Sequence, residues 1–145
     1  MQEYLLLYEK DNLTYMLDKD FNLHIKDMSL FKYLEILCLK YGSSLKGRID
    51  SFNYLTKNKY KPCLVVSNKD MIYYLSTRSL NSHDNILINY KYLDSYHHLD
   101  LDNTILNFKN HKQYQINCNY RILKRQKELM DKYLYQHYMI SGIIK

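Results

Sequence analysis

Residues 29–48 have the sequence SLFKYLEILCLKYGSSLKGR and contain the strongest local folding signals of the chain. Apolar side chains recur there at spacings of three and four, at Leu30, Tyr33, Leu34, Leu37 and Cys38. This spacing predicts a helix over Leu30–Leu39, with Ser29 as its N-cap and Gly42 at its C-terminal end. A second, basic helix is expected over Leu45–Leu55, opened by Ser43-Ser44.

Segments with apolar alternation on both sides of these helices predict strands. Before them, Glu3–Glu9 has a short apolar centre, and Leu13–Ile25 alternates in part around the turn Asp18-Lys19-Asp20. The segment between Asp94 and Asp102, which contains His97-His98, is interpreted as a polar turn. After the helices, two hairpins and one further strand are expected, at Cys63–Ser67 with Met71–Leu75, Thr104–Phe108 with Gln113–Ile116, and Asn85–Tyr92.

A long amphipathic helix is expected over Tyr120–Met139, capped by Asn119. Cations in its first turns oppose the helix dipole by about 0.3–1 kcal/mol each, so they suggest a role outside stability, with a solvated face as the alternative. Its mostly apolar stripe comprises Ile122, Gln126, Leu129, Met130, Tyr133 and His137. The element order β-β-α-α-β-β-β-β-β-α predicts one α+β domain over residues 1–145. We expect a mostly antiparallel sheet, two helices after the first hairpin and this C-terminal helix.

Composition excludes several classes of protein. The apolar fraction of 46% and charged fraction of 25% are ordinary for one globular domain. No apolar run approaches the roughly 18 residues of a membrane span, and the N-terminus does not resemble a secretory signal, so a cytoplasmic protein is expected. Three separated cysteines predict buried thiols. No metal or cofactor is expected, and no enzymatic motif is present. Scattered His and Asp residues leave an enzyme that acts on nucleic acid as an alternative.

The net charge of +6 is concentrated in two segments. Residues 40–61 carry six Lys and Arg against Asp50 alone, and residues 105–145 carry eight against Glu128 and Asp131. The segments before and between them are acidic overall. If the two basic segments share one face, they form a binding site for a polyanion; otherwise they are solvated surface.

Residues 41–48, Tyr-Gly-Ser-Ser-Leu-Lys-Gly-Arg, resemble the ComK family of bacterial competence transcription factors, in which an aromatic residue precedes Gly-Ser-Ser and a Gly-Arg pair follows. The resemblance covers about Leu30 to Tyr133. Further similar segments follow in order at Lys61-Pro62, Ser76-Thr77-Arg78, Asn103–Phe108 with Asn110, and the helix around Gln126. The chain departs from the family at residues 82–86, which lack its Cys and Trp, at Asn110-His111 in place of Asn-Gly, and in an expected shorter C-terminal tail.

The resemblance implies an activator that binds AT-rich promoter boxes of double-stranded DNA, largely through the minor groove, as a homo-oligomer at the bacterial nucleoid. It also implies an adaptor or protease partner. The alternative function is an interaction module that keeps the fold, does not bind DNA and modulates another regulator.

The residues expected to bind DNA are cations and hydroxyls of the matching segments. Arg48 is favoured for insertion into the groove, and Gly42 permits close backbone approach. Structural alternatives are helix caps at Gly42 and Ser43, and an ion pair of Arg78 with Asp84. The complete set is Lys40, Ser43, Ser44, Lys46, Arg48, Lys57, Lys59, Lys61, Thr77, Arg78, Lys112, Arg121, Lys124 and Arg125.

Overall fold

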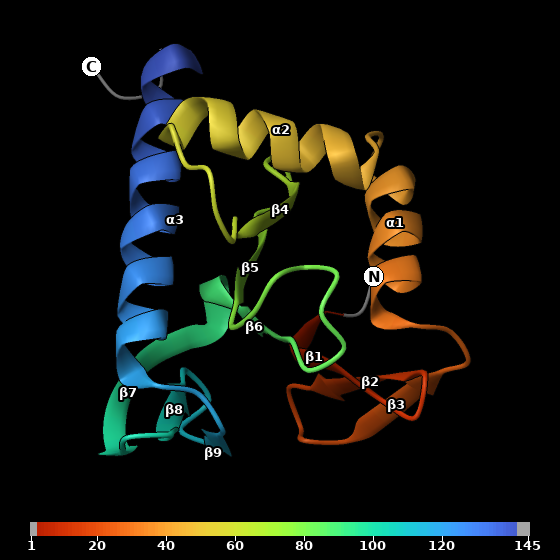
Figure 1. The fold of residues 1–145 in the computed structure, drawn as a ribbon, viewed down its shortest axis with the longest axis vertical. Helices are drawn as coiled ribbons and strands as arrows, with labels where there is room; N and C mark the ends of the chain where they lie inside the picture. Colours follow the sequence, from red (N-terminus) through yellow and green to blue (C-terminus); the bar gives the residue numbers. More distant parts are fainter. Residues whose placement is uncertain (1–2, 142–145) are drawn as a thin grey trace.

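The strands form two separate antiparallel sheets in the computed structural model, which describes residues 3–141 (Figure 1). The larger sheet has the order β3-β2-β1-β6-β5-β4 and the smaller one the order β7-β8-β9. The fold is therefore α+β, with two sheets where the sequence indicated one. The strands are β1 (Tyr4–Lys10), β2 (Leu13–Asp18), β3 (Leu23–Lys26), β4 (Leu64–Ser67), β5 (Ile72–Ser76), β6 (Ile86–Asn89), β7 (Leu93–Asp100), β8 (Asn103–Phe108) and β9 (Gln113–Ile116).

Strands β4 and β5 of the larger sheet are buried on both faces. Successive residues of a strand point to opposite faces, so Leu64 and Val66 of β4 pack with Leu34 of α1 (Leu30–Lys40). Val65 points the other way, into the cluster that contains Leu123 of α3 (Tyr120–Ser141). Burial from both sides explains why β4 is a continuous apolar run rather than an alternating one.

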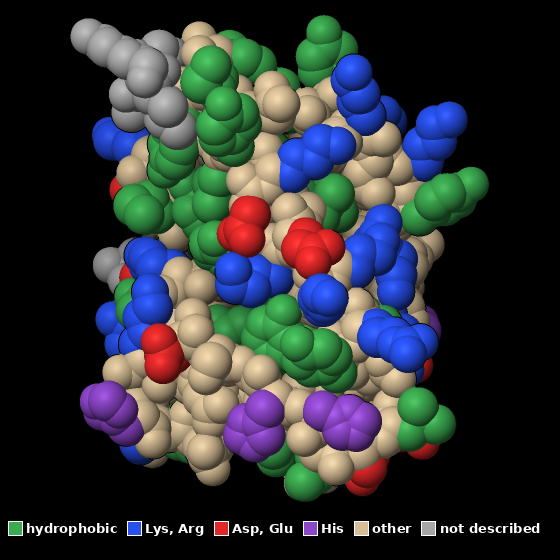
Figure 2. Space-filling view, turned by 90° about the vertical axis from the view of Figure 1, so that its left-hand side faces the viewer, with side chains coloured by type: hydrophobic (Ala, Val, Ile, Leu, Met, Phe, Trp, Pro, Cys, Tyr) green, Lys and Arg blue, Asp and Glu red, His purple; other side chains and the backbone are tan. Residues whose placement is uncertain are grey.

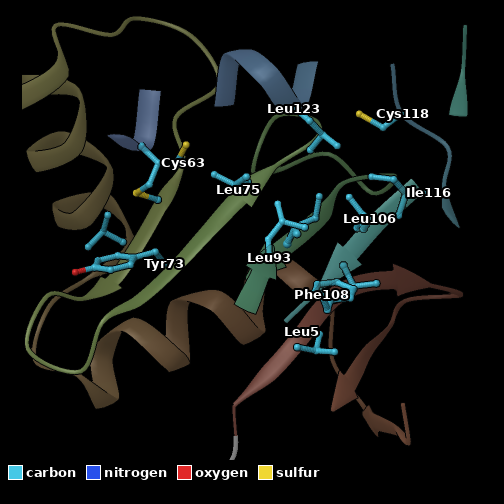
Figure 3. Close-up of a cluster of buried hydrophobic side chains, with 14 of the residues drawn as sticks. Leu5, Cys63, Tyr73, Leu75, Leu93, Leu106, Phe108, Ile116, Cys118 and Leu123 are labelled. Atoms are coloured by element: carbon cyan, nitrogen blue, oxygen red, sulfur yellow. The ribbon is translucent and has the colours of Figure 1, made fainter. Parts of the chain in front are cut away.

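The smaller sheet completes the core on the α3 side. Figure 3 shows Leu106 and Phe108 of β8 directed into the same cluster as Leu5 of β1, Leu75 of β5 and Leu123 of α3. The inward residues of β8 are buried and alternate with half-buried ones, as expected for a sheet with one covered face. Because β9 pairs with β8 and Thr104 Oγ1 of β8 donates to Cys118 O, this packing also fixes the chain that leads into α3.

Helix α2 (Leu45–Thr56) crosses one end of the molecule, from the end of α1 to the side of α3 (Figure 1). Its Phe52 is fully buried and stacks on Tyr133 of α3, with ring centroids 5.0 Å apart. Ser29 caps α1 by accepting a hydrogen bond from Lys32 N, and Asn119 accepts one from Arg121 N at the start of α3. The three predicted helices and both of these caps are confirmed.

The structure corrects the sequence-based assignment in three places. The segment interpreted as a polar turn is strand β7, in which only Leu93 is buried, so it lacks the alternation that reveals a strand. The strand expected over Asn85–Tyr92 ends at Asn89, and Tyr90–Tyr92 forms a 3-10 turn. Three strands rather than two precede the helices. The additional strand is Tyr4–Lys10, which lies between β2 and β6 in the sheet.

Candidate nucleic-acid interface

The Gly-Ser-Ser segment forms a tight corner between α1 and α2. Gly42 has a φ of +89°, and its N–H donates to Leu39 O while Ser43 N–H donates to Cys38 O. This pair of bonds is the Schellman motif, which requires a left-handed residue that glycine adopts at low cost. Ser44, not Ser43, is the N-cap of α2, and its Oγ accepts a hydrogen bond from Gly47 N at 2.9 Å.

Gly47 and Arg48 also have structural roles at this corner. A Cβ on Gly47 would lie 3.0 Å from both the Ser43 and Ser44 hydroxyl oxygens, so glycine leaves room for them. Arg48 is half-buried, and one guanidinium nitrogen donates to Tyr41 O at the end of α1, at 3.1 Å. Most of the segment of residues 41–48 therefore has a folding function, and Arg48 does not extend freely into solvent.

Two cations of the corner, Lys40 and Lys46, lie away from α3. Lys40 ends α1 and is exposed, and Lys46 stands in the first turn of α2, where it pairs with Asp50 at 2.6 Å. Helix α2 ends beside α3 but begins beside α1 (Figure 1). At 1.5 Å of rise per residue, Lys46 lies about 16 Å along the helix from Lys57. The corner and α3 therefore do not form one compact patch.

The connector of residues 57–62, by contrast, lies directly against α3. Arg125 of α3 donates from its guanidinium to Asn58 Oδ1 at 2.9 Å and to Tyr60 O at 3.1 Å. At the end of α2, Lys132 Nζ donates to Thr56 O at 2.8 Å. These bonds bring together the two basic segments of the sequence, since Asn58 and Arg125 are 67 positions apart.

A buried amide fixes the position of the connector. Gln126 has 0% exposed surface. Its Oε1 accepts hydrogen bonds from Ser76 N at 3.0 Å and Cys63 Sγ at 3.2 Å, and its Nε2 donates to Lys61 O at 2.9 Å. All the polar atoms of the amide group thus bind the sheet or the connector. Gln126 belongs to the predicted apolar stripe of α3, but its role as an anchor was not predicted.

The loop of residues 77–85 contributes one cation near the start of α3. Burial raises the pKa of the Cys118 thiol, and the positive charges of Arg78 and Lys61 offset part of the rise. Arg78 pairs with Asp84 at 3.5 Å, which is the loop ion pair considered from the sequence. Thr77 is 2% exposed, and its hydroxyl accepts a hydrogen bond from Ile86 N, so it is not available on the surface.

The first turns of α3 present cations without acidic partners. Arg121 and Lys124 are exposed, and within the described part of the chain neither forms an ion pair. Figure 2 views the molecule from the α3 side and shows many Lys and Arg side chains on this face, around a smaller number of acidic ones near its centre. We call the following residues the basic face: Lys57, Lys59, Lys61, Arg121, Lys124 and Arg125.

Two features bound the basic face. A groove of about 490 Å³ between α3 and β7 is lined by Lys124 of this face and, beyond it, by the acidic side chains of Asp94, Glu128 and Asp131. Lys112 lies on the turn between β8 and β9, where it donates to Asp20 O at 3.1 Å and lies over the Phe21 ring. Lys112 is thus directed toward the β2–β3 turn rather than toward α3.

Sequence reasoning overlooked the residues that assemble this face. Asn58 and Tyr60 supply the acceptors for Arg125, and Gln126 holds Lys61, yet none of these three was a candidate. One available signal was the charge pattern, because residues 57–69 contain four lysines and no Asp or Glu. The contacts themselves join distant segments and have no local signature.

The remaining chemistry of the described residues is structural. Cys38, Cys63 and Cys118 are free, buried thiols, as predicted. Burial raises the pKa of Cys38 to about 11, which keeps the thiol protonated and unreactive at neutral pH. Between residues 3 and 141, no helix combines the length and apolar character needed to cross a membrane.

Among the comparisons with known proteins, a family profile matches nearly the whole chain. The sequence profile described as ComK protein matches residues 6–139. Neither the curated proteins nor the solved structures give a match to the chain. The profile spans β1 to the last turns of α3, and therefore includes both segments of the basic face. The chain belongs to the ComK family, a family of competence-related transcription factors rather than of enzymes.

Proposed function

We propose that this ComK-family chain regulates transcription by binding AT-rich double-stranded DNA with its basic face. One observation carries the proposal: the hydrogen bonds of Arg125 to Asn58 and Tyr60 join two cationic segments into one surface. Cations that oppose the dipole of α3 and have no acidic partner are costly to stability, which favours a role in binding.

The charges of this face suit the phosphate backbone of DNA. Each phosphate neutralised by Lys or Arg releases counterions. The slope of the logarithm of the binding constant against the logarithm of the salt concentration therefore falls by about 0.9 for each contact. If all six cations of the basic face contact phosphates, a slope of about −5 is expected. Arg125 has fixed partners on the connector, so it positions the surface, while the exposed Arg121 and Lys124 are the cations most available to DNA.

AT preference follows from groove shape in this proposal. A-tracts have a narrow minor groove with enhanced negative potential, which attracts Arg and Lys. The basic face extends along α3 from Arg121 to the level of Lys132, which binds Thr56 O next to Lys57. This rise of about 16 Å corresponds to about five base pairs of B-DNA. Longer AT-rich boxes then require more than one copy of the chain, so we propose that it binds as a homo-oligomer.

Fluorescence anisotropy with two duplexes of equal length tests the proposal. One duplex carries spaced A- and T-tracts, the other is GC-rich, and both are titrated with the protein across a salt series. Tighter binding to the AT-rich duplex with a steep salt slope supports the proposal. Equal affinity for both duplexes would contradict groove selectivity. No binding at low salt would contradict DNA binding altogether and favour an interaction module.

A further inference from the structure

Tyr60 is an exposed aromatic side chain among the lysines of the basic face. Its side chain is 75% exposed, and Lys57, Lys59 and Lys61 surround it in sequence. Its ring takes no part in the aromatic contacts of the described residues. The ring therefore remains in water in the folded chain, and burial of its apolar surface does not contribute to stability.

The backbone that carries this ring is held firmly. Tyr60 O accepts hydrogen bonds from Asn58 Nδ2 at 2.7 Å and from the Arg125 guanidinium at 3.1 Å. The next carbonyl, that of Lys61, accepts from buried Gln126 at 2.9 Å. Lys57 and Lys61 both have positive φ, 57° and 40°, a conformation that is costly for residues other than glycine. An exposed ring on an anchored, strained connector is a preorganised contact.

We infer that Tyr60 contacts the bases of bound DNA, with its ring stacked against a base exposed at a flexible step while neighbouring cations hold the phosphates. This inference rests on the proposed function. Pyrimidine–purine steps such as TA unstack easily, and apolar side chains that enter the minor groove use such steps. Stacking on aromatic rings tolerates any base, so the selectivity comes from the ease with which the step opens.

Tyr54 provides a matched control. It is 81% exposed and lies on α2, two residues after Phe52, which faces α3. A separation of two residues turns the helix by about 200°, so Tyr54 points away from α3 and from the basic face. It follows Asp50 by one turn, whereas Tyr60 has lysines on both sides.

The test uses an AT-rich duplex with 2-aminopurine in place of adenine at a central TA step. Full-length wild type, Tyr60→Ala, Tyr60→Phe and Tyr54→Ala are compared by anisotropy across a salt series and by 2-aminopurine fluorescence. We expect Tyr60→Ala to bind at least about fivefold more weakly with an unchanged salt slope, and to lose the fluorescence change. Tyr60→Phe and Tyr54→Ala should match wild type in both readouts.

Each other outcome has a distinct meaning. If wild type binds with a steep slope and Tyr60→Ala matches it in affinity and fluorescence, the inference is wrong and the proposed function stands. If Tyr60→Ala lowers the salt slope but leaves the fluorescence change intact, the ring only positions lysines, which also overturns the inference. If wild type does not bind the duplex at low salt, both fall. Circular dichroism melts check that the variants fold, which the exposure of both tyrosines favours.

Discussion

Replacing Gln126 by Leu tests whether the buried amide holds the connector on α3. Leucine has a similar size but its side chain cannot form hydrogen bonds. The buried Ser76 N–H and the partly buried Lys61 C=O would therefore each lose their hydrogen-bond partner. Cys63 keeps a second acceptor, the Gln126 main-chain carbonyl. An unsatisfied buried backbone group costs about 1–3 kcal/mol, and less where water reaches it. We therefore expect a loss of about 3 kcal/mol in the free energy of unfolding.

Chemical denaturation at equilibrium measures this loss directly. For a chain of this size, about 3 kcal/mol corresponds to a fall in Tm of about 6–12 °C. Gln136→Leu is the control, because Gln136 lies on the same helix, is half-buried and makes no side-chain hydrogen bond among the described residues. A change below about 0.5 kcal/mol for Gln126→Leu, or equal losses in both variants, would refute the role assigned to this amide.

Three further perturbations test the corner and one ion pair. Replacing Gly by Ala in a helix normally raises the free energy of unfolding by about 1 kcal/mol. Gly47→Ala should give no such gain, because the new Cβ would crowd the hydroxyl of the Ser44 cap. A gain of about 1 kcal/mol in chemical denaturation would contradict this. Arg48→Ala should lower the free energy of unfolding by about 1–2 kcal/mol through loss of the bond to Tyr41 O, and unchanged stability would count against it. The hydrogen bond from His24 lowers the pKa of Asp18, so the stability from this pair is present above the ordinary carboxyl pKa and is lost as pH falls through the lowered value. In Asp18→Asn, the free energy of unfolding should fall less steeply with pH below about pH 4 than in wild type. An equally steep fall would rule out a contribution of this pair to stability.

Local patterns were sufficient to predict most of the fold. Ser29, Gly42 and Asn119 act at helix ends because capping depends on a few adjacent residues. Strand β7 was missed because all its residues except Leu93 and the half-buried Tyr96 are exposed, so it shows no alternation. The separation into two sheets depends on long-range pairing, which leaves no periodic signal within a strand.

The candidate site was harder to predict than the fold. Arg48 and Ser44 belong to the most distinctive motif, yet their polar atoms bind the ends of α1 and α2. Charge alone identified the basic segments, but only the contacts of Arg125 and Gln126 show which of them meet. A motif at a tight corner combines folding and binding signals, and the sequence does not separate them.

We expect DNA to bind to the basic face rather than to the corner between α1 and α2. The most direct measurement is the salt slope of binding to one AT-rich duplex for two double variants of equal charge change. Arg121→Gln with Lys124→Gln should reduce the slope by about two and weaken binding, whereas Lys40→Gln with Lys46→Gln should leave both close to wild type. The opposite result, with the slope reduced only by the corner variant, would contradict the account.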